Sequence, residues 1–190
     1  MPKAICVYCS SSNSVDPHYF DVARELGKNI AVRQDSLIYG GASVGLMGET
    51  ASSVKKNGGK VVGIIPESIY GRGLAFEDAD EMVVTKGMRE RKAEMESRGD
   101  AFIALPGGFG TLEEVLEMIT LKQLHYHDKP IVLLNSNGFY SSLIDVFEHL
   151  FETKFAREVY RDLYHIAGTV DATFTYIDNY QAPDLGTKWT

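Results

Sequence analysis

Short apolar runs alternate along the chain with longer segments whose apolar residues recur at helical spacing. The apolar runs predict buried strands over residues 4–8, 37–39, 61–65, 81–84, 101–105 and 131–134. The periodic segments predict helices over residues 19–31, 46–54, 88–96, 112–124 and 140–151. Residues 68–80 predict a loop, and the end of the chain offers a short element at 163–166 and a final helix at 170–180.

This order of strands and helices predicts an α/β fold with a doubly wound, Rossmann-like parallel sheet. The strands are apolar without alternation, which is typical of a sheet covered by helices on both faces. We find no linker, repeat or low-complexity segment, so residues 1–190 are expected to form a single domain. Ligands of such sheets bind at the carboxyl ends of the strands.

The amino-acid composition and net charge argue against some classes of function. The chain is 44% hydrophobic and 24% charged, which is typical of a globular protein. Its net charge of −7 argues against non-specific nucleic-acid binding, which needs a basic face. Apolar runs stay below the ~20 residues that span a membrane, and the first residues lack the layout of a signal peptide. We therefore expect a cytoplasmic protein that binds neither nucleic acid nor membranes.

The most informative segment follows the strand at 101–105, where Pro106 leads into Gly107, Gly108 and Gly110. Glycine lets the backbone approach a ligand closely. The helix that begins here points free N–H groups and the positive end of its dipole toward the same space. Together these features predict an anion site, most often for phosphate.

Two carboxylates, Glu113 and Glu114, come directly after this loop. A carboxylate beside a phosphate suggests chemistry on a phosphorylated substrate rather than simple anion binding. A structural alternative is a capping box, in which Thr111 is the N-cap and Glu114 reaches back to its amide. In that case Glu113 is the freer carboxylate.

A second glycine-rich motif, residues 40–48, also leads from a strand into a helix. It lacks the lysine of a phosphate-binding P-loop and the spacing of a dinucleotide fingerprint. Its glycines either let the helix pack closely on the sheet or contact a ligand. We favour ligand contact by Gly41, Gly45 and Met47, because both glycine motifs share one sheet edge. Ser11, in the serine-rich turn after the first strand, could hold phosphate or ribose, or could simply form a turn.

The segment from Met88 to Met95 places Arg89, Arg91 and Lys92 on about one helical turn. A solvated helix face with i to i+4 ion pairs is the ordinary explanation. The helix nevertheless precedes the strand that delivers the Pro-Gly-Gly loop, so its first turn could reach the same pocket. An arginine there would bind phosphate in bidentate fashion.

Cysteine and histidine give weaker signals. Cys6 and Cys9 match a redox spacing, but Cys6 lies inside a strand, so we expect ordinary thiols in a reducing compartment. His125 and His127 lie two residues apart without a second ligand cluster, so we expect no metal site. The residues indicate no cofactor.

With these motifs, the chain resembles the Lonely guy (LOG) family of cytokinin-activating phosphoribohydrolases, whose members have also been labelled lysine decarboxylase-like. The resemblance runs from residue 4 to about 151. Residues 106–114 match the motif P-G-G-x-G-T-x-x-E, and residues 88–92 match M-x-x-R-K. Residues 40–48 match G-G-G-x-x-G-L-M-G with Ala42 in place of a glycine, and residues 9–12 match C-G-S-S with Ser10 in place of glycine.

The resemblance implies hydrolysis of the N-glycosidic bond of a nucleoside 5′-monophosphate, with release of a base and ribose 5-phosphate. It assigns catalysis to Arg91 and Glu114. The substrate-binding positions that it implies, with Met88 from the second motif, are Glu81, Met88, Lys92, Gly107, Gly108, Gly110, Thr111, Glu113 and Thr120. It also implies a homodimer with sites near the interface.

Two other functions compete with this one. A nucleotide-binding sensor module would use the same pocket without turnover, although such a protein gains nothing from a carboxylate beside phosphate. Amino-acid decarboxylation with pyridoxal phosphate would require a Schiff-base lysine, and the sequence marks none.

Overall fold

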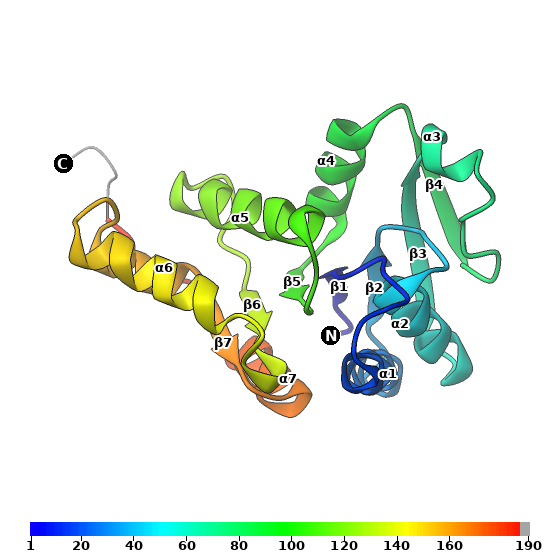
Figure 1. Ribbon diagram of the computed structural model, residues 1–190, viewed down its shortest axis with the longest axis horizontal. Coiled ribbons are helices and arrows are strands. Elements are labelled where there is room, and N and C mark those ends of the chain that lie inside the picture. Colours follow the sequence, from blue (N-terminus) through cyan, green and yellow to red (C-terminus); the bar gives the residue numbers. More distant parts are fainter. Residues whose placement is uncertain (187–190) are drawn as a thin grey trace.

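The computed structural model describes residues 1–186 and is built on a parallel sheet of seven strands (Figure 1). The strands are β1 (Ala4–Tyr8), β2 (Ser36–Tyr39), β3 (Lys60–Pro66), β4 (Glu81–Thr85), β5 (Ala101–Ala104), β6 (Ile131–Leu134) and β7 (His165–Ala167). Their order is β4-β3-β2-β1-β5-β6-β7, and every neighbouring pair is parallel. The predicted doubly wound α/β class is confirmed.

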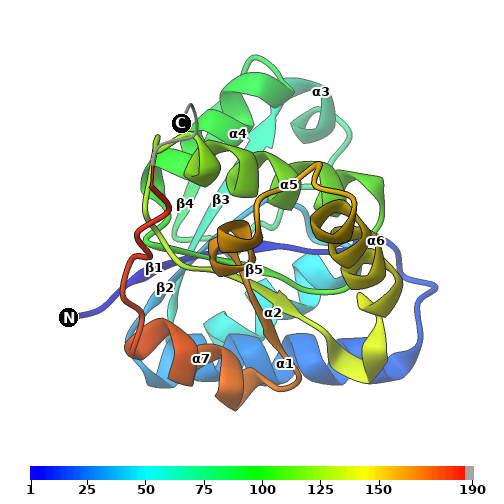
Figure 2. The same ribbon diagram turned by 90° about the vertical axis from the view of Figure 1, so that its left-hand side faces the viewer.

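Helices cover both faces of this sheet, as Figure 2 shows. They are α1 (Pro17–Val32), α2 (Gly45–Lys56), α3 (Glu67–Tyr70), α4 (Met88–Arg98), α5 (Phe109–Gln123), α6 (Ser141–Glu152) and α7 (Val170–Asp178). Helices α1, α2 and α7 lie on one face, and α4, α5 and α6 lie on the other (Figure 2). Among the helices of residues 1–186, we find none with the length and apolar character needed to cross a membrane.

The core divides into two layers because successive strand residues point to opposite faces. In β1, Ile5 and Val7 pack with α1 and α2, whereas Cys6 and Tyr8 pack toward α4 and α5. All four residues are at most 3% exposed. Burial on both faces explains why the strands are apolar without alternation.

Two parts of the chain differ from the sequence prediction. The predicted loop at 68–80 begins with the single helical turn of α3, which buries none of its residues and so leaves no apolar periodicity to detect. The short element predicted at 163–166 is the end of a 3₁₀ segment, Glu158–Leu163, followed by strand β7. Both differences involve elements too short for a periodic signal.

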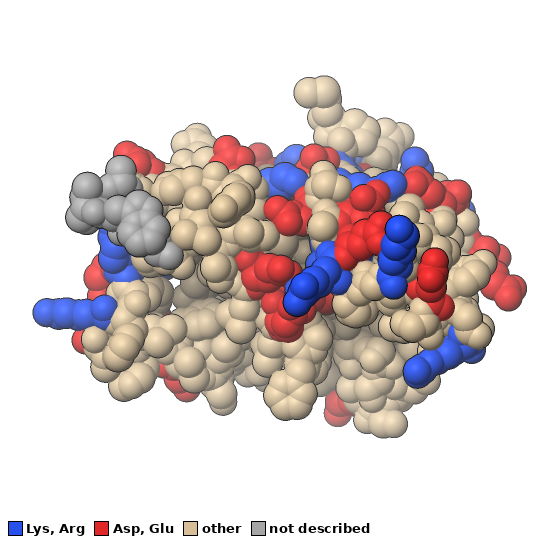
Figure 3. Space-filling view, turned by 90° about the horizontal axis from the view of Figure 1, so that it is seen from above, with Lys and Arg blue, Asp and Glu red and all other residues tan. Residues whose placement is uncertain are grey.

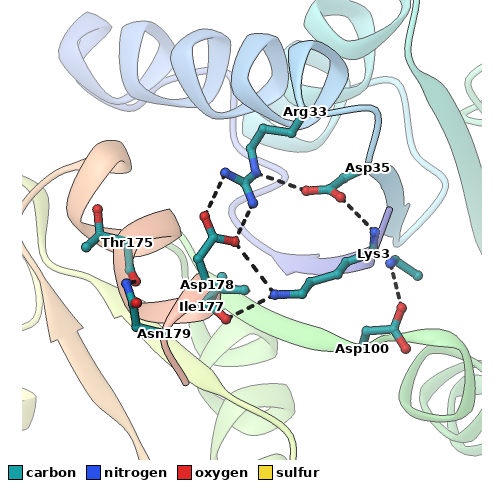
Figure 4. A network of polar contacts seen from close by, with 9 residues as sticks. Lys3, Arg33, Asp35, Asp100, Thr175, Ile177, Asp178 and Asn179 are labelled. Atoms are coloured by element: carbon teal, nitrogen blue, oxygen red, sulfur yellow. Dashed lines mark hydrogen bonds and ion pairs between the residues drawn. The ribbon is translucent and has the colours of Figure 1, made fainter. Parts of the chain in front are cut away.

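A polar network ties the two ends of the chain together at the amino edge of the sheet (Figure 4). The buried carboxylate of Asp35 accepts hydrogen bonds from the Lys3 amide at 2.7 Å and from Arg33 Nε at 3.1 Å. Arg33 and Lys3 both contact Asp178 at the end of α7. This network lies at the opposite sheet edge from the glycine-rich loops, so it stabilises the fold without reaching them.

The loops at the carboxyl edge are joined by backbone hydrogen bonds. The amide of Ser10 donates to Pro106 O at 3.2 Å, which connects the loops after β1 and β5. The amide of Ser43 donates to Leu74 O at 2.8 Å, which connects the loop after β2 to the segment that follows α3. The amide of Leu46 donates to Ser10 O at 2.9 Å and connects these two pairs. The four segments therefore form one cluster, as expected for parallel strands.

Candidate functional site

A cavity of about 550 Å³ lies among these four loops and the first turns of α4 and α5. Its volume is within the range of small-molecule sites. Its lining residues are Cys9, Ser10, Ser11, Ser12, Gly40, Ala42, Val44, Met47, Ile69, Arg72, Leu74, Met88, Arg91, Gly108, Phe109, Gly110, Thr111 and Glu114.

The N-terminus of α5 offers free backbone donors to this cavity. The helix begins at Phe109, its N-cap is Gly108, and no side chain caps it. In residues 1–186, the amides of Phe109, Gly110 and Thr111 donate to no protein acceptor. Three free amides at a helix N-terminus form an anion site.

The structure rules out the capping box, the structural alternative for Thr111 and Glu114. Because the helix already begins at Phe109, Thr111 lies inside its first turn and cannot be the N-cap. Glu114 does not fold back onto the helix end either, since its carboxylate is hydrogen-bonded to Arg91. Glycine at the N-cap leaves the end of α5 open to a ligand.

The N-terminus of α2, in contrast, is already occupied by protein acceptors. The Gly45 amide donates to Asn13 Oδ1 at 2.8 Å, and the Leu46 amide donates to Ser10 O at 2.9 Å. Gly45 has φ +60°, and a Cβ there would lie 2.5 Å from the Ser11 carbonyl carbon. The glycines of this motif thus allow close packing and leave few donors for an anion, so α5 is the better anion site.

A buried ion pair lies on the wall of the cavity between α4 and α5. Arg91 Nη1 donates to Glu114 Oε1 at 2.6 Å, and the two residues are only 7% and 8% exposed. Arg91 Nε donates to Ile64 O at 3.0 Å, which fixes the guanidinium against the end of β3. The predicted catalytic pair is therefore in direct contact.

Gly40 makes room for this pair. A Cβ at Gly40 would lie 2.1 Å from Nη2 of Arg91, closer than any side chain could tolerate. The first glycine of the second motif therefore gives the guanidinium the space it occupies beside the cavity. This relation links the loop after β2 to the α4–α5 wall.

Burial raises the pKa of Glu114 above its ordinary value of 4.5, and the guanidinium of Arg91 opposes that rise. The carboxyl is thus held in a partly dry environment beside a permanent positive charge. A carboxylate of this kind can stabilise positive charge on a ligand or accept a proton from water.

The structure brings eight of the predicted site residues to the cavity: Ser11, Met47, Met88, Arg91, Gly108, Gly110, Thr111 and Glu114. The other predicted substrate-binding residues lie outside its lining. Gly41 and Gly107 are close by in the loops but face protein atoms, since a Cβ at Gly107 would lie 2.1 Å from Thr111 Oγ1. Gly45 packs against Ser11, as described above.

Four further predicted residues lie away from the cavity of this chain. Glu81 begins β4 at the amino edge of the sheet, where it forms an ion pair with Arg98 at 2.6 Å. Lys92 contacts Glu113 on the outer surface of α4 and α5. Thr120 is exposed, further along α5, and its hydroxyl donates to Leu116 O.

Sequence reasoning missed Arg72, an exposed cation that lines the cavity from the segment after α3. The sequence gives one indication of this position: Arg72 lies between Gly71 and Gly73, after the third strand has ended at the ligand-binding edge of the sheet. Its placement depends on the hydrogen bond between Ser43 and Leu74, which no local pattern predicts.

The cysteines and histidines are accounted for by protein contacts. Cys6 and Cys9 are free, buried thiols, and burial raises the pKa of Cys6 to about 12. His127 Nε2 lies 3.0 Å from Met118 O, and its Nδ1 accepts from the Lys129 amide. His125 Nε2 lies 3.1 Å from Gly186 O.

The chain is similar to known proteins in sequence and in fold. A family profile described as "Possible lysine decarboxylase" matches residues 47–177. A probable cytokinin riboside 5′-monophosphate phosphoribohydrolase of Oryza sativa subsp. japonica is 42% identical over 178 residues, 94% of this chain and 73% of that protein. A cytokinin riboside 5′-monophosphate phosphoribohydrolase of Arabidopsis thaliana is also 42% identical over 178 residues, with 94% and 83% of the two chains covered.

The chain belongs to the LOG family. Solved structures of lower identity share the fold. The molybdenum cofactor binding protein of Rippkaea orientalis has a TM-score of 0.72 at 23% identity, covering 94% of this chain and 96% of that one. The molybdenum cofactor carrier protein of Chlamydomonas reinhardtii has a TM-score of 0.70 at 24% identity, covering 94% and 97%. These matches show that the LOG chain shares its fold with the two molybdenum cofactor proteins.

The electrostatics of the ion pair can be tested in the LOG protein without substrate. In a carbon-NMR titration of the folded protein, we expect Glu114 to take up its proton above pH 4.5, because burial disfavours the carboxylate. Arg91→Met should raise this pKa further, since it removes the opposing positive charge. Arg161→Met, a remote surface change, should leave it unmoved. A midpoint at or below 4.5 in the unmodified protein would show that burial does not raise the pKa of Glu114.

Proposed function

We propose that this LOG-family chain is an enzyme that hydrolyses the N-glycosidic bond of purine nucleoside 5′-monophosphates, either AMP or cytokinin-type nucleotides. The products are the free base and ribose 5-phosphate. The observation that carries the proposal is the shared cavity of the free α5 amides and the buried carboxylate of Glu114. The curated relatives bear the name of this activity.

The proposed mechanism follows from two features of the cavity, the free amides of α5 and the carboxylate of Glu114. The 5′-phosphate binds the amides of Phe109, Gly110 and Thr111 at the positive end of α5. The sugar then extends toward Glu114, five residues further along the helix from Phe109. As the base departs, positive charge develops at C1′, and the Glu114 carboxylate stabilises it and accepts a proton from water.

Arg91 acts on the carboxylate rather than on the phosphate. Its Nη1 and Nε already donate hydrogen bonds to Glu114 Oε1 and Ile64 O. It holds the carboxylate in one orientation and offsets its charge, so that an anionic substrate can enter the same cavity.

Charge balance then points to Arg72. Among residues 1–186 that line the cavity, the cations are Arg91 and Arg72. Arg91 is neutralised by Glu114, whereas Arg72 is exposed at the cavity wall and forms no ion pair with the described residues. A dianionic phosphate needs a further positive charge besides the helix dipole, and we propose that Arg72 supplies it.

We further propose a homodimer formed through α4 and α5, with sites near the interface. Phe109 and Leu116 are 93% and 37% exposed, and they share one stripe of α5 with Glu113 and Thr120. Acidic and basic side chains lie side by side over this surface, shown from above in Figure 3. Such a dimer would account for the substrate-binding roles expected of Glu113 and Thr120, which lie outside the cavity of one chain.

We also propose a cytoplasmic location, a single domain and no binding of nucleic acid. A cytoplasmic location is compatible with the free thiols of Cys6 and Cys9. A single domain over 1–190 is supported by a sheet that takes strands from residues 4 to 167. The net charge of −7 supports the absence of nucleic-acid binding. The alternative of a sensor without turnover gains no support from the named relatives.

Turnover is the direct test. Incubation with AMP or with isopentenyladenosine 5′-monophosphate should release the free base, detected by chromatography. Glu114→Gln should lower the rate by on the order of 10²–10⁴-fold, since a positioned proton acceptor is worth that much. The matched change Glu148→Gln, on α6, should leave the rate unchanged. Failure to release base from any nucleotide, by protein with an intact circular dichroism spectrum, would refute the proposal.

Arg72→Met tests the charge argument. Loss of a charge-assisted contact to phosphate costs about 1.5–3 kcal/mol. We therefore expect KM to rise by about 10–100-fold. Most of the effect should fall on KM rather than kcat, because the phosphate does not react. Arg161→Met serves as the matched surface control. An unchanged KM would show that Arg72 does not meet the substrate.

Sedimentation equilibrium tests the dimer. The unmodified protein should give the mass of two chains, and Leu116→Arg should shift it toward one, because the charge would be buried at the α5 stripe. Val146→Arg, at an exposed apolar position on α6, is the control and should leave the mass unchanged. A single-chain mass for the unmodified protein at all concentrations would disprove the dimer.

A further inference from the structure

The backbone that carries the free amides of α5 is held by few contacts. The Leu105 amide donates to Tyr8 O at 2.9 Å, and Pro106 then ends the ladder because it has no N–H. Pro106 O accepts from the Ser10 amide at 3.2 Å, at the long end of the range for a hydrogen bond. From Gly107 to Thr111, the amides donate to no protein acceptor in residues 1–186. The direction of these amides therefore depends on how the chain is fixed just before them.

The hydroxyl of Tyr140, in the loop after β6, fixes the chain at this point. It donates to Leu105 O at 2.6 Å, and the tyrosine is only 1% exposed. In the part of the chain that the structure describes, no other group donates a hydrogen bond to this carbonyl, and no other side chain is hydrogen-bonded to residues 105–111. A short, buried hydrogen bond to an otherwise unpaired carbonyl holds that carbonyl in one direction.

Tyr140 is itself held from a second side. Its amide donates to Asn135 Oδ1 at 2.6 Å, and the Asn135 amide donates to Ala167 O in β7 at 2.7 Å. Its ring packs edge-to-face against Phe139, with 4.9 Å between the ring centroids. The hydroxyl therefore projects from a well-anchored loop, and it connects the edge strands β6 and β7 to the Pro-Gly-Gly loop.

On the basis of the proposed function, we infer that Tyr140 is a positioning residue for the 5′-phosphate of the nucleotide. Tyr140 does not line the cavity. It acts through Leu105 O, which sets the path of the backbone out of β5 and so the direction of the amides of Phe109, Gly110 and Thr111. Donors held in place before an anion arrives bind it more tightly, because less freedom is lost on binding. Without the hydroxyl, the same amides remain but are less well oriented.

Tyr140→Phe removes the hydroxyl and keeps the ring. We expect KM for AMP to rise by about 5–10-fold, roughly the worth of one hydrogen bond, while kcat changes by less than about twofold. The inhibition constant of ribose 5-phosphate should rise by the same factor. That of adenine, which has no phosphate, should stay unchanged. A tyrosine that only stabilised the fold would lower the melting temperature and move none of these constants.

Tyr39→Phe is the matched control. Tyr39 is also 1% exposed and ends β2 at the same edge of the sheet, but its hydroxyl has no hydrogen-bond partner among residues 1–186. We expect its KM and both inhibition constants to equal those of the unmodified protein. Asn135→Ala frees the amide of Tyr140 and should raise the ribose 5-phosphate constant in the same direction. It takes the place of Tyr140→Phe if that variant does not fold.

An unchanged inhibition constant for ribose 5-phosphate in folded Tyr140→Phe, or in Asn135→Ala if it takes that place, would overturn the inference. An equal rise for ribose 5-phosphate and adenine would overturn it as well, because the phosphate would then not be the part affected. In both cases the unmodified protein still releases adenine from AMP, so the proposed function stands. Absence of adenine release by the unmodified protein would contradict the proposed function, and this inference with it.

Discussion

The buried ion pair of Arg91 and Glu114 is the contact on which the rest of the site depends. It joins α4 to α5 above the ends of the central strands, and its guanidinium is fixed to β3 through Ile64 O. Breaking such a pair by removing one partner typically costs 3–5 kcal/mol, whereas apolar replacement of both can be neutral. A pair of this kind adds little net stability, so its value to the protein lies in the position that it gives to the carboxylate.

The two glycine motifs have different structural roles around this ion pair. At the second motif, Gly40 admits the guanidinium and Gly45 lets α2 pack on the serine turn, where acceptors of Ser10 and Asn13 fill its N-terminus. At the Pro-Gly-Gly motif, Gly108 ends the loop without a capping side chain, so the amides of α5 stay free. Similar sequences at one sheet edge therefore differ at their helix N-termini: the N-terminus of α2 is filled by protein acceptors, and the N-terminus of α5 keeps free amides.

Much of this arrangement could be predicted from the sequence. The apolar runs predicted the first six strands along the chain, and the position of each glycine motif after a strand placed both at the carboxyl edge. The family motifs predicted that Arg91 and Glu114 belong together, and the structure confirms their contact. These features depend on local periodicity and on fixed spacing, which a single sequence contains.

The errors have equally physical causes. The helix predicted from residue 112 begins already at Phe109, which excludes the capping-box alternative, because a glycine N-cap gives no side-chain signal. Arg72 was missed because its placement depends on the tertiary bond between Ser43 and Leu74. Strand direction places Glu81 at the amino edge of the sheet, away from the cavity of one chain, and its substrate-binding role stays a prediction.

A crystal structure of Glu114→Gln bound to AMP would test the central claim most directly. We predict phosphate oxygens within hydrogen-bond distance of the amides of Phe109, Gly110 and Thr111, and C1′ beside the side chain of residue 114. A phosphate bound away from the N-terminus of α5, or residue 114 turned from the sugar, would contradict the account.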